Sequence, residues 1–181
     1  IFMKKVLIIS ASPRKGGNSD TLCDEFAKGA IESGNSVEKI FLKDKNIRFC
    51  TGCGYCNTVD YPACSQKDDM AEILDKAVAA DVIVMATPVY FYTMNAIMKN
   101  FIDRCCSRYT KITNKEFYFI ATAADVREQM LQRTFDGFEG FLDCLDGAIE
   151  KARIYGVGVW GKDEIKKTKF IQQAYDLGKN V

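Results

Sequence analysis

The sequence has 181 residues, of which 48% are hydrophobic and 27% are charged, and its formal net charge is +1. This length is sufficient for one domain with a substantial core, and the composition is that of an ordinary globular protein. Because the basic residues are spread along the chain and nearly balanced by acidic ones, we expect neither nucleic acid nor an acidic membrane surface as a partner.

Strand and helix patterns alternate along the whole chain. Short apolar runs predict strands at residues 6–10, 36–42, 81–87, 117–123 and 154–160. Amphipathic patterns predict helices at residues 19–33, from Asp68, at residues 94–109 and 127–150, and up to about Asn180. This alternation predicts an α/β fold over residues 1–181, with a five-stranded parallel sheet between two layers of helices.

The expected strand order is 2-1-3-4-5, because the first and third predicted strands are the most uniformly apolar and so the most buried. In such a sheet, ligands bind at the carboxyl ends of the strands, where the strand order reverses between the first and third strands. The loops at residues 10–18, 43–67, 87–94 and 122–127 are expected at this edge.

The loop after the first strand reads SASPRKGGNSD, residues 10–20. Its candidate donors to an anion are Ser10, Ser12, Arg14, Asn18 and Ser19. Hydroxyl, amide and guanidinium donors at a helix N-terminus suit a phosphate monoester. The loop lacks both G-x-x-x-x-G-K-[ST] and G-x-G-x-x-G, which argues against a triphosphate or dinucleotide loop. The alternative is an ordinary turn in which Ser19 caps the helix.

The loop after the third strand reads TPVYFYTMN, residues 87–95, and carries Pro88, Tyr90, Phe91 and Tyr92. Aromatic side chains on a ligand-facing loop favour a planar ring as ligand. The alternative is that they cover the core or a subunit contact. A phosphate site and a ring site at one edge of the sheet together predict flavin mononucleotide (FMN).

A third loop, CTGCGYCNTVDYPAC, contains Cys50, Cys53, Cys56 and Cys64. Thiolates at every third position can surround one iron–sulfur cluster, whereas structural zinc usually uses two separated C-x₂-C pairs. We therefore predict a [4Fe–4S] cluster on these four residues, although the gap before Cys64, with Asp60, Tyr61 and Pro62, is long. The alternatives are four free thiols or a Cys56–Cys64 disulfide.

The remaining cysteines, Cys23, Cys105, Cys106 and Cys144, lie in helical patterns and are expected to be small buried residues. Asp103 and Arg104 are expected to form a structural ion pair. The chain contains no histidine, which excludes a Ser-His-Asp triad and a histidine general base. No apolar run is long enough for a transmembrane helix or a signal peptide, so we expect a cytoplasmic protein without a membrane partner.

Five motifs carry a resemblance to a known family: SASPRKGGNS (10–19), CTGCGYC (50–56), KDDM (67–70), ATPVYF (86–91) and KNFIDR (99–104). With them the sequence resembles the flavodoxin-like NAD(P)H-dependent FMN reductases, and within these the iron–sulfur flavoproteins. The resemblance implies a flavodoxin-like three-layer sandwich, FMN as cofactor, NAD(P)H as co-substrate, and a homodimer or homotetramer.

The same resemblance implies roles for particular residues. Ser12, Arg14, Asn18 and Ser19 would hold the FMN phosphate. Pro88, Val89, Tyr90 and Phe91 would line the isoalloxazine ring, and Thr122 to Asp125 would form a third flavin loop. That loop is often glycine-rich in the family and reads TAADV here.

Three functions follow as alternatives. The first is an FMN-dependent oxidoreductase that passes electrons from NAD(P)H to a quinone, flavin or similar small acceptor, with no catalytic side chain because the cofactor does the chemistry. The second is an iron–sulfur flavoprotein that carries electrons between protein partners. The third is a zinc-stabilised nucleotide-binding module. The long loop at residues 43–67 also predicts a homo-oligomer, because loops of this length usually pack on something.

Overall fold

The computed structural model describes residues 3–58 and 63–181, so Asp60, Tyr61 and Pro62 of the cysteine loop lie outside the described residues. Five parallel strands form the main sheet: β1 (Lys5–Ser10), β2 (Ser36–Phe41), β3 (Val82–Tyr90), β5 (Glu116–Thr122) and β6 (Ile149–Gly156). Their order, β2-β1-β3-β5-β6, confirms the predicted topology. An additional short strand, β4 (Thr93–Met94), pairs antiparallel to β3.

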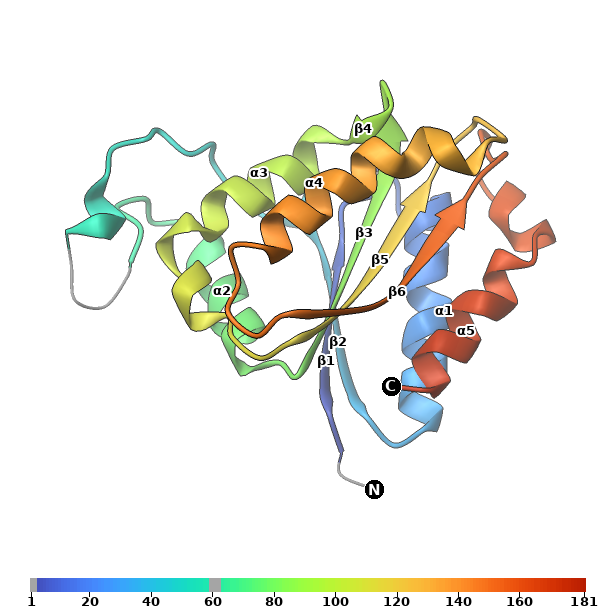
Figure 1. Cartoon of the computed structure of the whole chain (residues 1–181), viewed down its shortest axis with the longest axis horizontal. Helices are drawn as coiled ribbons and strands as arrows, with labels where there is room; N and C mark the ends of the chain where they lie inside the picture. Colours follow the sequence, from blue (N-terminus) through green and yellow to red (C-terminus); the bar gives the residue numbers. More distant parts are fainter. Residues whose placement is uncertain (1–2, 59–62) are drawn as a thin grey trace.

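Two layers of helices cover the sheet (Figure 1). On one face lie α1 (Asn18–Glu32) and α5 (Phe170–Lys179), and on the other lie α2 (Met70–Ala79), α3 (Ala96–Arg104) and α4 (Gln132–Leu142). Alternate residues of β1 point to opposite faces, as a strand requires, so Ile8 packs under α1 whereas Ile9 packs under the α2–α3 layer. Among the described residues, no helix is both long and apolar enough to cross a membrane.

The predicted boundaries are least accurate near the C-terminus. The helix expected at residues 127–150 is a 3₁₀ turn, Glu128–Leu131, followed by α4, which ends at Leu142. The last strand, expected at residues 154–160, already begins at Ile149. Its first residues alternate between exposed and half-buried because β6 is an edge strand, and they therefore lack the apolar run of a buried strand.

The helix expected at residues 94–109 is also shorter. It ends at Arg104 and is followed by two 3₁₀ turns, Cys105–Ser107 and Tyr109–Lys111.

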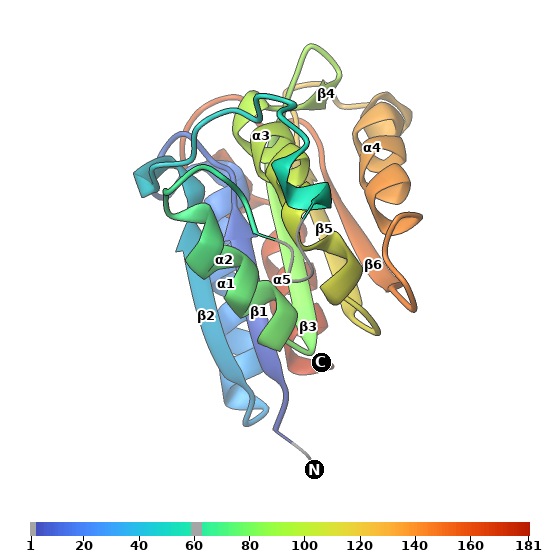
Figure 2. The ribbon, with the colours of Figure 1, turned by 90° about the vertical axis from the view of Figure 1, so that its left-hand side faces the viewer.

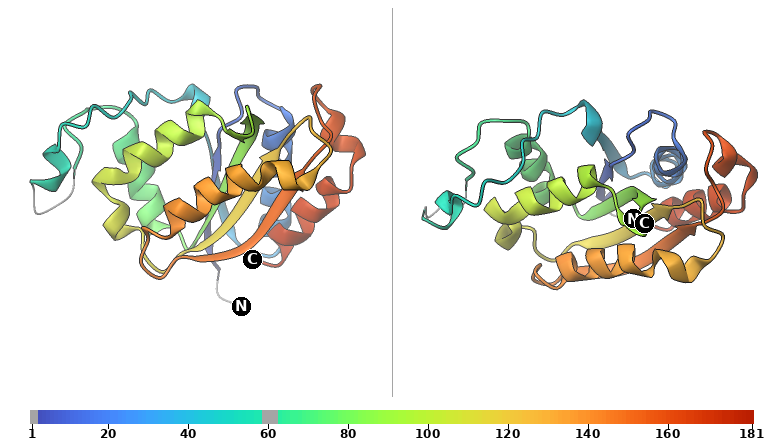
Figure 3. Two further views of the ribbon diagram at one scale, coloured as in Figure 1. Left: turned by 45° about the horizontal axis from the view of Figure 1, so that its top comes forward. Right: turned by 90° about the horizontal axis from the view of Figure 1, so that it is seen from above.

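The segment after β2 leaves the carboxyl edge of the sheet, extends beside α3 to its far end and then returns to the start of α2 (Figures 2 and 3). Its tip contains a 3₁₀ turn, Tyr55–Asn57, that packs near the turn Cys105–Ser107 after α3. We expected this whole loop to lie on the ligand edge of the sheet. Only its first residues, after β2, lie there, and its cysteines lie at the opposite end of α3, which at about 1.5 Å per residue is about 14 Å long.

Candidate functional site

A cavity of about 410 Å³ opens at the carboxyl edge of the sheet. Four segments form its walls. They are the loop after β1 with the start of α1 (Ser12, Arg14, Asn18, Ser19), the end of β3 (Pro88, Val89, Tyr90), the end of β5 with the residues after it (Thr122, Ala123, Ala124), and Val159 with Trp160. The structure thus brings three of the predicted ligand loops together at one cavity.

The loop after β1 turns tightly before α1 begins. The Ser12 hydroxyl donates to the carbonyl of Arg14 at 2.8 Å, and the backbone N–H of Gly17 donates to the same carbonyl at 2.9 Å. A Cβ atom on Gly17 would lie 2.7 Å from Ser12 Oγ and 3.0 Å from the Arg14 carbonyl oxygen, so this position has room only for glycine. The turn sets the N-terminus of α1, which favours negative charge, against the cavity.

Ser19 has a buried hydroxyl that lacks a partner. Its side chain lines the cavity and is 1% exposed, and Oγ makes no hydrogen bond within the part of the chain that the structure describes. The alternative role predicted for Ser19 is wrong, because the N-cap position of α1 is Gly17 and no side chain caps it. A buried hydroxyl without a partner is costly, and an anion in the cavity would satisfy it.

Two other residues of this loop use their polar groups inside the protein. The hydroxyl of Ser10 is buried outside the cavity lining and donates to Asp20 at 2.8 Å. Asn18 lines the cavity, but its amide donates to the carbonyl of Gly161 at 3.0 Å and accepts from the N–H of Ile165 at 3.3 Å. In this structure, Ser10 supports the loop and Asn18 fastens the segment that follows Trp160.

Trp160 was not among the predicted site residues. It is 81% exposed and forms one wall of the cavity. The sequence offered one signal for it: Trp160 is the only tryptophan of the chain and the last residue of the last predicted strand, at the edge where ligands bind.

The loop after β3 forms a hairpin with β4. Its turn residues, Phe91 and Tyr92, have positive φ values of 50° and 63°, which is costly for bulky side chains and typical of functional loops. Pro88, Val89 and Tyr90 line the cavity, whereas Phe91 is fully exposed at the tip of the hairpin.

Asn95 connects this hairpin to the loop after β1. Its side chain is 2% exposed and donates to the carbonyl of Ala11 at 2.7 Å. Its Oδ1 accepts from the N–H of Met98 at 3.0 Å, which caps α3. One buried amide therefore sets the spacing between two walls of the cavity.

In the loop after β5, Thr122 lines the cavity and Asp125 does not. Hydrogen bonds from the side chain and the backbone of Arg127 occupy the carboxylate of Asp125 and lower its pKa to about 2. Asp125 therefore stays ionised and holds the loop in shape.

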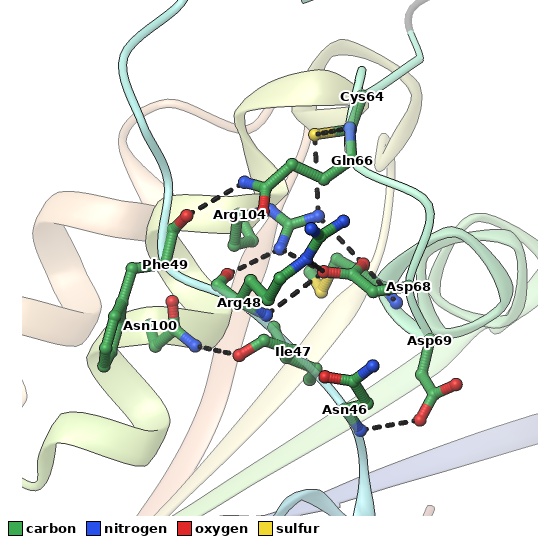
Figure 4. Close-up of polar contacts among 11 residues, drawn as sticks. Asn46, Ile47, Arg48, Phe49, Cys64, Gln66, Asp68, Asp69, Asn100 and Arg104 are labelled. Carbon is green, nitrogen blue, oxygen red and sulfur yellow. Dashed lines mark hydrogen bonds and ion pairs between the residues drawn. The ribbon is translucent and has the colours of Figure 1, made fainter.

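The base of the cysteine loop is held together by a buried ion pair, which Figure 4 shows. Arg104 donates from Nη1 to Asp68 Oδ2 at 2.7 Å and from Nη2 to Asp68 Oδ1 at 3.0 Å, and both side chains are at least 98% buried. Arg104 also donates to the carbonyl of Arg48 at 2.6 Å and approaches the Cys64 sulfur at 3.5 Å. It thus binds the segment before the loop's cysteines, at Arg48, and the segment after them, at Asp68.

The predicted ion pair between Asp103 and Arg104 is wrong, because neighbouring positions on α3 face different surroundings. Asp103 pairs with Lys99 on the exposed side of the helix, whereas Arg104 points into the base of the loop. The helix expected from Asp68 begins at Met70, and Asp69 holds its N-cap position. Although burial opposes its ionisation, the hydrogen bonds from Arg104 hold the pKa of Asp68 below its usual value.

At the tip, the four cysteines of the loop and Cys106 line a second cavity of about 160 Å³. Gly52 and Gly54 adopt positive φ values of 63° and 70°, which lets the backbone turn between the thiols. A hydrogen bond with Ser65 lowers the pKa of the Cys53 thiol.

Within the described residues, no three Cys, Asp or Glu side chains lie close enough together to bind a metal ion. The four-thiol donor set itself fits an iron–sulfur cluster.

The other cysteines divide into two groups. Cys23 and Cys105 are buried as predicted, and burial raises the pKa of both thiols, which makes them unreactive. The prediction of burial is wrong for Cys106 and Cys144, which are both exposed. Cys106 lies in the turn after α3, so the spacing of apolar residues along that helix does not predict whether Cys106 is buried.

A parallel sheet of this order, with a cavity at its switch point and a tight donor-rich turn after β1, defines the flavodoxin-like class of α/β nucleotide-binding folds. Residues 4–136 match the NADPH-dependent FMN reductase family, and the chain belongs to this family.

Its relatives include iron–sulfur flavoproteins of Archaeoglobus fulgidus. One is 41% identical over 100 residues, which cover 55% of this chain and 44% of that protein. Another is 30% identical over 176 residues, which cover 92% of this chain and 88% of that protein. The chain spans about half the length of the first curated relatives that it matches.

Solved structures support the same fold. The NAD(P)H:quinone oxidoreductase from Methanothermobacter marburgensis is 16% identical and superposes with a TM-score of 0.75, over 99% of this chain and 96% of that one. At this level of identity, the similarity supports the fold alone.

Proposed function

We propose that this chain is an FMN-dependent oxidoreductase that takes electrons from NAD(P)H and passes them to a quinone, a flavin or a similar small acceptor. The observation that carries the proposal is the unpartnered Ser19 hydroxyl, buried at the N-terminus of α1 in a cavity of nucleotide size. Membership of the NADPH-dependent FMN reductase family supports the choice of FMN and NADPH.

In this proposal the phosphate lies at the turn after β1. Ser19 would donate its unpartnered hydroxyl and Arg14 would supply positive charge, while Ser12 would turn its hydroxyl from the Arg14 carbonyl to the phosphate. The guanidinium of Arg14 is exposed and forms no ion pair with any described residue, so it is available to an anion. Asn18 would act indirectly, because its amide already fastens residues 161 and 165.

The ring would lie between the loop after β3 and the segment around Trp160. Pro88, Val89 and Tyr90 form one wall, and Thr122 with Trp160 forms another. The bound flavin would supply hydride and single-electron chemistry, which is why the site needs no side chain as an acid or base. The residues of the chain bind the cofactor, orient its ring and shield part of it from water.

We expect purified protein to carry FMN and to oxidise NADPH when a quinone is added. The measurement is the fall in NADPH absorbance with and without the quinone, on protein whose flavin content is known from its visible spectrum. Flavin-loaded protein that does not oxidise NADPH or NADH would favour the second function, an electron carrier between proteins. Purified protein that neither contains nor binds FMN would refute the proposal and favour a zinc-stabilised module.

A second part of the proposal is a [4Fe–4S] cluster held by Cys50, Cys53, Cys56 and Cys64. These four residues line one cavity, and the relatives in Archaeoglobus fulgidus carry the name iron–sulfur flavoprotein. We expect about four iron and four sulfide per chain after anaerobic purification, as the cluster composition requires. Cys53→Ala should lose most of this iron while Cys144→Ala keeps it. Iron-free anaerobic protein with full FMN occupancy would contradict the assignment.

We also propose a homo-oligomer. Phe91, Val126 and Trp160 are exposed, and each lies within two residues of a residue that lines the first cavity or lines it itself. Exposed apolar side chains that gather in one region mark interaction surfaces. Sedimentation at micromolar concentration should therefore show a species at least twice the 20.3 kDa chain mass. A monomer under these conditions would refute this part of the proposal and leave the aromatic residues as ligand contacts.

A further inference from the structure

Cys106 lies beside the cysteine loop, although it is far from it in sequence. Its sulfur is 4.0 Å from the sulfur of Cys56, 50 residues earlier in the chain. Cys106 belongs to the turn Cys105–Ser107 after α3, and Cys56 belongs to the turn Tyr55–Asn57 at the tip of the loop. Both residues line the cavity of about 160 Å³.

This proximity is supported by the base of the loop. Arg104 lies two residues before Cys106 and binds both arms of the loop, through the carbonyl of Arg48 and the carboxylate of Asp68 (Figure 4). On the same helix, Asn100 donates to the carbonyl of Ile47 at 3.0 Å. Residues on both sides of the loop's cysteines are therefore tied to α3, the helix that leads directly into the turn with Cys106.

We propose that Cys56 and Cys106 form a redox thiol pair that closes to an intrachain disulfide when the loop holds no cluster. A disulfide needs its sulfur atoms about 2.05 Å apart, so the thiols must approach each other by about 2 Å. Both thiols lie in short 3₁₀ turns near the surface, where a shift of this size breaks no core packing. The arrangement favours Cys106 over Cys64 as the partner of Cys56.

The oxidant in this step is a low-molecular-mass disulfide. A thiolate of one cysteine attacks it, forms a mixed disulfide and releases one thiol. The second cysteine then attacks the mixed disulfide and releases the second thiol. The two cysteines lose two electrons and two protons in total, and both appear in the two thiol molecules released.

This thiol pair is separate from the proposed flavin site, and its oxidation does not require the flavin. Cys56 is also one of the four residues proposed to bind the cluster, and one sulfur cannot do both. The disulfide and the complete cluster would therefore exclude each other, which makes Cys106 a residue that senses oxidation at the loop.

The test uses the full chain, purified with a reductant and a chelator so that it holds no metal. After removal of the reductant, the protein is exposed to oxidised glutathione, free thiols are blocked, and its disulfides are mapped by proteolysis and mass spectrometry. We expect a Cys56–Cys106 peptide as the main product, with two fewer free thiols per denatured chain than in the reduced protein.

Three variants make the result specific. Cys106→Ser and Cys56→Ser should each lose this peptide and leave the remaining partner open to alkylation. Cys144→Ser is the matched control, because Cys144 is also exposed but donates to the carbonyl of Gly140 on α4, and this variant should behave like the wild type. The proposal is overturned by a wild-type product dominated by Cys56–Cys64 or by disulfides between chains. Equal thiol loss in the wild type and Cys106→Ser, or no thiol loss at all, would overturn it as well.

Discussion

Arg104→Met should destabilise the protein by about 3–5 kcal/mol, the usual cost of leaving one partner of a buried ion pair alone. The side chain of Asp68 is fully buried, and its carboxylate would lose both of its hydrogen bonds from the guanidinium. The carbonyl of Arg48 would lose its donor at the same time. Urea unfolding of the wild type and the variant, followed by circular dichroism, measures the difference in the free energy of unfolding.

Lys99→Met is the matched control on the same helix. Lys99 pairs with Asp103 four residues on, and both side chains are about half exposed, so its loss should cost less than about 1 kcal/mol. The double variant Asp68→Asn/Arg104→Met should recover part of the lost stability, because no unpaired charge remains buried. If Arg104→Met and Lys99→Met cost the same, the buried pair does not hold the loop.

The same pair gives the stability a defined dependence on pH. Because the pKa of Asp68 is lower in the folded protein than in the unfolded chain, its ionised form stabilises the fold. This contribution is complete above the unfolded pKa of about 3.9 and is lost as the pH falls further through the folded pKa. The free energy of unfolding should therefore fall less steeply with decreasing pH in Asp68→Asn than in the wild type.

The second large effect concerns the phosphate site. Ser12→Ala combined with Arg14→Ala should weaken FMN binding by roughly a hundredfold or more, since each hydrogen bond to a charged group contributes about 1.5–3 kcal/mol. Ser19→Ala should weaken it by roughly tenfold or more for the same reason. Gly17→Ala should also weaken it, because the added Cβ would press on Ser12 Oγ and the Arg14 carbonyl. Titration of flavin-free protein with FMN, read by the quenching of flavin fluorescence, measures each dissociation constant.

Ser33→Ala is the control for these variants. Ser33 follows the last residue of α1 and donates to the carbonyl of Lys179, far from the cavity, so FMN affinity should not change. Unchanged affinity in the Ser12/Arg14 double variant would place the phosphate elsewhere.

The sequence by itself determined the architecture and the chemistry available to it. The apolar runs identified the three central strands closely, because burial of a central strand is recorded in its own residues, whereas the edge strand β6 was found with shifted bounds. The same reading identified the loops that meet at the cavity, since the carboxyl ends of parallel strands lie at one edge. The spacing of Cys50, Cys53 and Cys56 was likewise visible as a local pattern.

Only the tertiary structure decided which partner each polar or thiol group meets. Ser10 and Ser19 are both serines of one loop, yet Ser10 donates to Asp20 and Ser19 is left unpartnered in the cavity. Arg104 pairs with Asp68 rather than its neighbour Asp103, and Cys106 meets Cys56 across 50 residues. The physical reason is that periodicity records whether a residue is buried, whereas the identity of its contact depends on how distant elements pack.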